Sequence, residues 1–298
     1  MRHLEKLGGA GLCLLSLLGG QLLVIYLLQA QLTETLFSRP EFLYLQVLPG
    51  LVWPLVAAWL FSAWQARRTP GVTALPFGYS LGLSALLTTS LMVPMYQQAV
   101  AKMAPEAACS LTWSACVAVT LLVGLCQILL APFAHKLTFS LSLPLCLGLG
   151  AAVAVQSLSG LLPWLQQHPL LLVAGLVPLI AYLVVGLPRP FGLSSGWLVL
   201  GTGLAAQILS GTRFEVPDFH STLFAGVSLF LWRRTGFLTV VLPVLVATLV
   251  RDLVLLRETQ VYPNAPAARN SLLGLGCINV LGACLGCGLP LAVLPGYL

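Results

Sequence analysis

The chain has 298 residues, of which 58% are hydrophobic and only 7% are charged, and its mean hydropathy is +0.97. A composition this apolar excludes an ordinary water-soluble globular domain and predicts a polytopic membrane protein. The formal net charge of +6 does not indicate nucleic-acid binding, because basic residues never cluster beyond adjacent pairs.

Successive apolar runs of about 18 residues or more predict about nine transmembrane helices in one membrane domain. The expected spans cover residues 8–31, 41–64, 79–97, 108–132, 138–161, 169–186, 192–210, 236–256 and 271–289. The shorter apolar piece at 219–234 ends on Arg233 and Arg234, which favours an interfacial or re-entrant helix. We therefore expect an all-α membrane protein.

The basic residues predict an orientation. The first apolar run follows Arg2 and Lys6 and contains no clear small-residue cleavage site, which favours a membrane anchor over a signal peptide. With the N-terminus cytoplasmic, the inner side holds more basic residues than the outer side, a mild positive-inside bias. The inner set is Arg2, Lys6, Arg67, Arg68, Lys136, Arg189, Arg257 and Arg269, and the outer set is Arg39, Lys102, Arg213, Arg233 and Arg234.

The segment Thr73–Ser80, with the sequence TALPFGYS, places Pro76 and Gly78 directly before a short apolar run. Residues 81–96 would make roughly 24 Å of helix at about 1.5 Å per residue, whereas the hydrocarbon core is about 30 Å thick. Non-helical backbone persists at membrane depth only where it is buried in protein or lines a cavity. The segment therefore predicts a broken third helix with a short extended strand, as in transporters. The alternative is an ordinary inner loop between the second and third spans.

The polar stretch Gly211–Asp218 follows the seventh expected span and thus divides the chain after an odd number of spans. A repeat that follows it would start from the other side of the membrane, as in inverted-repeat transporters. We expect a first seven-helix repeat at 1–210 (core helices within 8–132, gate helices within 138–210), a loop and interfacial helix at 211–235, and an incomplete second repeat at 236–298. A second Pro/Gly-rich stretch, Gly286–Gly296, follows the ninth span as the first stretch follows the second span.

The eighth expected span carries the densest group of ionisable residues, Arg251, Asp252, Arg257 and Glu258. An intramembrane carboxylate is a candidate for proton coupling or solute binding, so Asp252 and Glu258 are the coupling candidates. The alternative is that the helix leaves the bilayer near Val254 and these groups reach water.

The sequence contains no paired carboxylates or Walker loop, which predicts that the protein is not an enzyme and has no catalytic residues. Its histidines are scattered and its single Cys-x-x-Cys has no second pair, so we expect neither a metal site nor a cofactor.

Three segments together suggest a family. Residues 73–78 read TALPFG, residues 187–193 read LPRPFGL, and the run from Arg269 to Leu273 is followed by Gly276, Gly286, Pro290, Val293 and Gly296. This combination resembles the nucleobase and ascorbate permease family, in particular its bacterial xanthine/uracil permease-like branch. The first segment resembles the family's signature at the broken third helix, and the others resemble its entry into helix seven and its ninth helix with the start of the tenth.

The resemblance implies two inverted repeats divided into a core and a gate, with solute held between the strand-containing third and tenth helices. The expected substrate-binding residues are Thr73, Phe77, Gly78, Tyr79, Ser80 and Glu258, and the facing wall is expected at Leu289, Pro290, Leu291, Ala292 and Val293. A carboxylate near the end of the eighth helix would bind the base. Counting from Ser271 without gaps puts Arg257 at that position, and a shift of one residue puts Glu258 there.

The chain also departs from the family pattern. It stops at Leu298, where the tenth helix should begin, and Ser80–Leu81 replaces an Asn-Thr pair of the family. The leading hypothesis is a secondary-active permease of the bacterial inner membrane that moves a purine- or pyrimidine-like solute by alternating access, coupled to H+ or Na+. The alternatives are a truncated or split permease fragment, which would need a second chain for its missing helices, and a sulfate-permease-like anion transporter of the same fold. Members of the family often form homodimers through the gate.

Overall fold

The computed structural model describes residues 47–68, 77–140, 237–259 and 265–293, together with single positions between 144 and 169. All its described helices and strands belong to one compact unit formed by residues 29–160 and 218–296. A second unit comprises residues 1–28, 161–217 and 297–298, and only single positions of it are described. The expected spans at 8–31 and 192–210 and the piece at 219–234 lie outside the described residues, and those at 138–161 and 169–186 are described only in small part.

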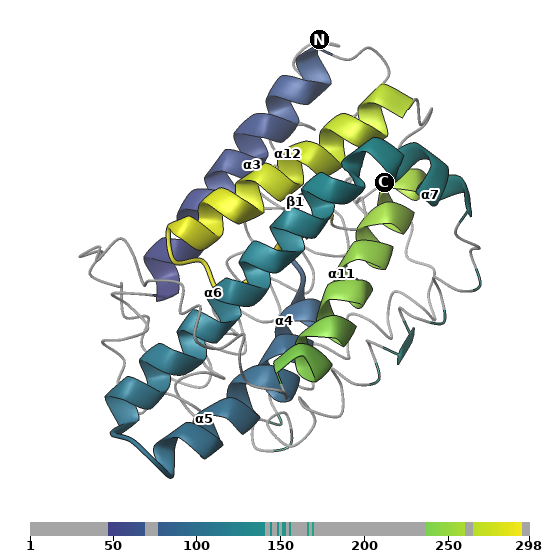
Figure 1. The fold of residues 1–298 in the computed structure, drawn as a ribbon. Helices are drawn as coiled ribbons and strands as arrows, with labels where there is room; N and C mark the ends of the chain where they lie inside the picture. Colours follow the sequence, from purple (N-terminus) through teal and green to yellow (C-terminus); the bar gives the residue numbers. More distant parts are fainter. Residues whose placement is uncertain are drawn as a thin grey trace. The chain divides into compact units, whose positions relative to one another are not determined.

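The described unit is mainly helical (Figure 1). Its long helices are α3 (Leu48–Arg68), α6 (Pro105–Leu130), α11 (Phe237–Thr259) and α12 (Ala265–Cys284), and its shorter ones are α4 (Leu81–Leu87), the π-helical η2 (Thr88–Met92), α5 (Val93–Val100), the 3-10 helix η3 (Ala131–Phe133) and α7 (Ala134–Ser140). Two strands, β1 (Phe77–Tyr79) and β2 (Leu291–Val293), complete it.

Helix α6 begins where Pro105 occupies the first turn, since proline lacks only an N–H that the helix would leave unpaired there. Glu106 in the same turn complements the positive end of the helix dipole. In the described part of the chain, the stretch Pro105–Leu137 is the one helix long and apolar enough to cross a membrane, with a mean hydropathy of 2.3. By itself this helix does not establish a membrane protein, and the nine expected spans remain a prediction.

Helix α12 lies between α3 and α6, and α11 packs on α6 (Figure 1). Glycines make the close packing of α6 and α12 possible. A Cβ atom at Gly124 would lie 2.9 Å from the carbonyl oxygen of Gly276, and one at Gly276 would lie 2.8 Å from that of Gly124. The two backbones therefore touch here without intervening side chains, as small residues allow in membrane helices.

The strands β1 and β2 pair antiparallel inside the helical unit, with Phe77 opposite Val293, Gly78 opposite Ala292 and Tyr79 opposite Leu291. All of these residues are buried. Helix α4 starts directly after β1, because the Ser80 hydroxyl accepts a hydrogen bond from the Leu83 N–H (3.4 Å) and caps the helix. The segment in which a broken helix was expected thus holds a strand followed by a helix start.

Helix α12 begins at Ala265 and ends at Cys284, whereas the expected span was 271–289. It ends early because Gly286 has a positive φ of 87°, a conformation that side chains disfavour. The Cys287 N–H donates to the Gly282 carbonyl (2.8 Å) and the Gly286 N–H donates to the Ala283 carbonyl (3.0 Å), which is a Schellman ending. The chain therefore leaves the helix before residue 291, where β2 begins and pairs with β1.

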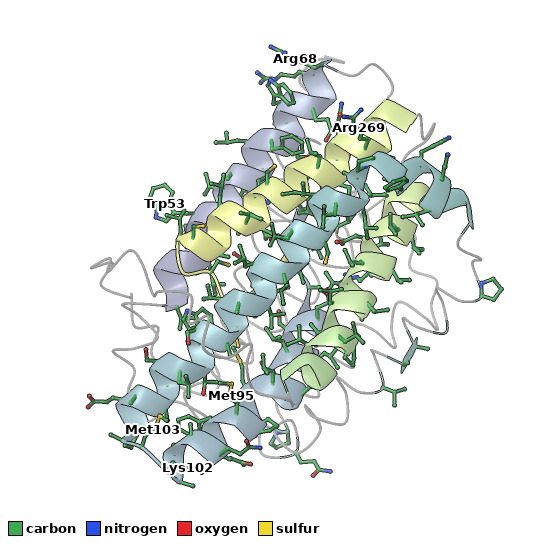
Figure 2. The ribbon with its side chains drawn as sticks, viewed as in Figure 1. Trp53, Arg68, Met95, Lys102, Met103 and Arg269 are labelled. Atoms are coloured by element: carbon green, nitrogen blue, oxygen red, sulfur yellow. The ribbon has the colours of Figure 1, made fainter. Side chains whose placement is uncertain are left out.

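Three basic residues mark the two ends of the unit. Figure 2 shows Arg68 and Arg269 at one end of the helices and Lys102 at the other. The guanidinium carbon of Arg68 lies 5.0 Å from the ring centroid of Trp64, a cation–π contact. The predicted orientation places Arg68 and Arg269 on the inner side and Lys102 on the outer side. In the structure, too, Lys102 lies at the other end of the helices from Arg68 and Arg269.

Candidate functional site

The candidate site is the edge of β2 that faces away from β1, where a carboxylate from α11 meets the backbone. Asp252 is fully buried. Its Oδ1 accepts a hydrogen bond from the Val293 N–H (2.9 Å), and its Oδ2 accepts one from the Gln127 side-chain amide (2.7 Å). A buried carboxylate needs such donors, because an unpaired charge in an apolar interior costs several kcal/mol.

Two amide side chains continue this contact. The Gln127 Oε1 accepts a hydrogen bond from Asn279 Nδ2 (2.8 Å), and Asn279 is bound in turn to Leu291 of β2. Asn279 Nδ2 donates to the Leu291 carbonyl (2.9 Å), while the Leu291 N–H donates to Asn279 Oδ1 (2.8 Å). Helices α6, α11 and α12 therefore each contribute one polar side chain to a single network around β2.

The network covers the edge of β2 that faces away from β1. Peptide groups of successive residues in a strand point to opposite edges. Since Leu291 and Val293 turn their N–H groups to Asn279 and Asp252, the peptide groups of Ala292 face Gly78 of β1. Side chains thus take the place that a third strand would occupy, and the buried backbone is satisfied.

Aromatic side chains hold the other parts of the strand pair. The Trp59 indole N–H donates to the Phe77 carbonyl (3.3 Å), and the Tyr79 hydroxyl donates to the Leu51 carbonyl (2.6 Å). The Trp113 indole N–H donates to the carbonyl of Gly286 (3.0 Å), at the turn that leads into β2. These bonds fix β1 against α3 and the turn before β2 against α6.

The structure brings together most of the expected site residues. Phe77, Gly78 and Tyr79 form β1, Leu291, Ala292 and Val293 form β2, and Ser80, Leu289 and Pro290 are buried beside them. Phe77 is fully buried, with its ring centroid 6.2 Å from that of Phe61, and the peptide groups on one edge of β1 face β2 instead of an open space. Thr73 lies outside the described residues.

The two coupling candidates have different positions on α11. Asp252 reaches the strands, whereas Glu258 lies one residue before the end of the helix, and its side chain lies outside the description. At about 1.5 Å per residue, Glu258 is about 9 Å farther along the helix axis. Within the described residues, no group of His, Cys, Asp and Glu side chains could hold a metal ion.

Sequence reasoning did not single out Gln127, Asn279 or Trp113. Gln127 and Asn279 are each the single amide of an expected span that contains no charged residue. An amide at membrane depth needs a partner on another helix, and this requirement was the signal that would have found both residues. Comparisons of the chain with protein-family models, with curated proteins and with solved structures gave no match.

Proposed function

We propose that the chain acts as a membrane transporter that binds a planar, nucleobase-like solute where β1 and β2 pair, and moves it by alternating access. One observation supports this proposal above all: a pair of three-residue strands is buried among apolar helices, with a carboxylate on its edge. Non-helical backbone inside a membrane domain is typical of transporter binding sites.

The chemistry of the edge suits a solute with a ring N–H beside a ring carbonyl. An ionised carboxylate offers about four acceptor positions, and the described bonds to Asp252 use two of them. The Gln127 amide carries a second N–H beyond the one that Asp252 accepts. A lactam edge, as in uracil or xanthine, would find an acceptor and a donor side by side.

The same carboxylate argues against the anion-transporter alternative. An anionic solute next to Asp252 would bring two like charges together in an apolar interior, which is unfavourable. Asp252 is instead a natural place for a coupling ion, since an intramembrane carboxylate binds either a proton or a cation. We therefore favour H+ or Na+ coupling at Asp252.

Uptake of radiolabelled uracil or xanthine into proteoliposomes tests the proposal. We expect uptake that depends on an imposed H+ or Na+ gradient and is lost in Asp252→Asn. Glu258→Gln is the matched variant on the same helix, and we expect it to retain more uptake than Asp252→Asn. Absence of uptake of either base by the folded protein would refute the proposal, and inhibition by sulfate but not by bases would identify an anion transporter.

A further inference from the structure

The three side chains at the edge of β2 form a series of hydrogen bonds in which Asn279 donates to Gln127 and Gln127 donates to Asp252. Gln127 and Asp252 are 0% exposed and Asn279 is 1% exposed, so these polar groups depend on one another. An ionised carboxylate only accepts hydrogen bonds. Asp252 therefore requires the NH2 group of Gln127, as the 2.7 Å bond from Gln127 Nε2 to Asp252 Oδ2 shows.

The orientation at Gln127 then determines the orientation at Asn279. With its NH2 group turned to Asp252, Gln127 presents Oε1 to Asn279. Asn279 must therefore donate a hydrogen bond to this oxygen from its own NH2 group (2.8 Å). That choice leaves Asn279 Oδ1 to accept the Leu291 N–H (2.8 Å). Both hydrogens of the Asn279 amide are used, because the second is donated to the Leu291 carbonyl (2.9 Å).

We infer that Gln127 is a positioning residue that transmits the charge state of Asp252 to β2. For transport this role rests on the proposed function, because β2 would be one wall of the solute site. The chain links Asp252 to β2 twice, directly at Val293 and through Gln127 and Asn279 at Leu291. A change at residue 252 therefore acts on both ends of the strand.

With a neutral amide at residue 252, no orientation of the three side chains allows all of these hydrogen bonds to form. If the substituted side chain in Asp252→Asn accepted the Val293 N–H, its NH2 group would face the NH2 group of Gln127. A flip of Gln127 would move the conflict to Asn279, and a flip of Asn279 would break both of its bonds to Leu291. We therefore expect Asp252→Asn to loosen β2 although the substitution hardly changes the shape of the side chain.

The same reasoning identifies a double variant in which all of these hydrogen bonds can form again. In the double variant Asp252→Asn with Gln127→Glu, the new carboxylate at 127 accepts from the amides at 252 and 279. Asn279 keeps its orientation, and the total charge is unchanged. Gln127→Glu alone would instead place two carboxylates face to face, and the state in which both are ionised is then unfavourable.

Hydrogen–deuterium exchange of the peptide that contains Leu291, Ala292 and Val293 tests the inference on the full chain in detergent. We expect exchange at least about tenfold faster in Asp252→Asn and in Gln127→Glu, since each leaves buried polar groups unpaired. The double variant should return to within about threefold of the original rate. The controls are Thr120→Val on α6 and Thr248→Val on α11, whose buried hydroxyls donate to carbonyls of their own helices.

The inference is overturned if the double variant exchanges as fast as the two single variants, or if the single variants exchange no faster than the threonine controls. If a single variant does not fold, recovery of folded protein in the double variant supports the inference, and failure of both overturns it. Exchange requires no solute, so this result is separate from the uptake assay. If exchange in the double variant is slow again but the unsubstituted protein takes up neither base, the inferred hydrogen-bond network is supported and the transport proposal is refuted.

Discussion

Replacing Gly276 by alanine tests the close contact between α6 and α12. The added Cβ would lie 2.8 Å from the Gly124 carbonyl oxygen, whereas ordinary contact begins at 3.4 Å, so the backbone of α6 or α12 must shift to make room for it. Such overpacking costs about 1–3 kcal/mol, while alanine gains up to about 1 kcal/mol over glycine in helix propensity. The neighbouring Asn279–Gln127 bond, now 2.8 Å, would stretch unless its side chains follow. We expect a net loss of roughly 1–2 kcal/mol.

Thermal unfolding in detergent measures this effect. For a chain of this size the melting temperature falls by about 2–4 °C per kcal/mol, so the Gly276→Ala variant should melt roughly 2–8 °C lower. The matched control is Gly148→Ala, because a Cβ at Gly148 would meet nothing within 4 Å. Equal melting temperatures for Gly276→Ala and the unsubstituted protein, with Gly148→Ala also unchanged, would refute the backbone contact between α6 and α12.

Three further substitutions probe the turn into β2 and the anchor of β1, each by melting temperature. Gly286→Ala should destabilise the protein by about 1–2 kcal/mol, because Gly286 has a φ of 87°; an unchanged melting temperature would contradict the Schellman ending. Trp113→Phe should cost about 1–3 kcal/mol by leaving the Gly286 carbonyl without its donor, whereas Trp53→Phe, at a residue 54% exposed, should change stability by less than about 0.5 kcal/mol. Tyr79→Phe should cost about 1–2 kcal/mol through loss of the 2.6 Å bond to the Leu51 carbonyl, and equal stability would contradict a stabilising role for this bond.

The position of β1 was predictable because its signal is local. Pro76 and Gly78 are poor helix residues next to an apolar run, and backbone preferences act over a few residues. The structure places a strand at Phe77–Tyr79 and a second strand at Leu291–Val293, within the expected facing wall. The pairing register of the two strands depends on helices far apart in the sequence, and no local pattern encodes it.

The ends of α12 were less predictable, for a different reason. Hydropathy averages over many residues and marks where a chain is apolar, not where its helix begins or ends. Helix α12 starts at Ala265, in a less apolar stretch, and ends before Gly286, although the chain remains apolar beyond it. The backbone conformation of one glycine sets this end, and an average over the span conceals it.

The choice between Asp252 and Glu258 shows how the site depends on packing. A count from Ser271 reaches residue 257 or 258, but a count along the sequence does not determine which turn of α11 faces the strands. In the structure the helix presents Asp252 at the level of Val293, and Gln127 of α6 reaches the same carboxylate. Glu258 is about 9 Å farther along the helix axis. A solute that binds at the edge of β2 that faces away from β1 would therefore meet Asp252 first, and it would use the acceptor positions of Asp252 that the Val293 and Gln127 N–H groups leave open.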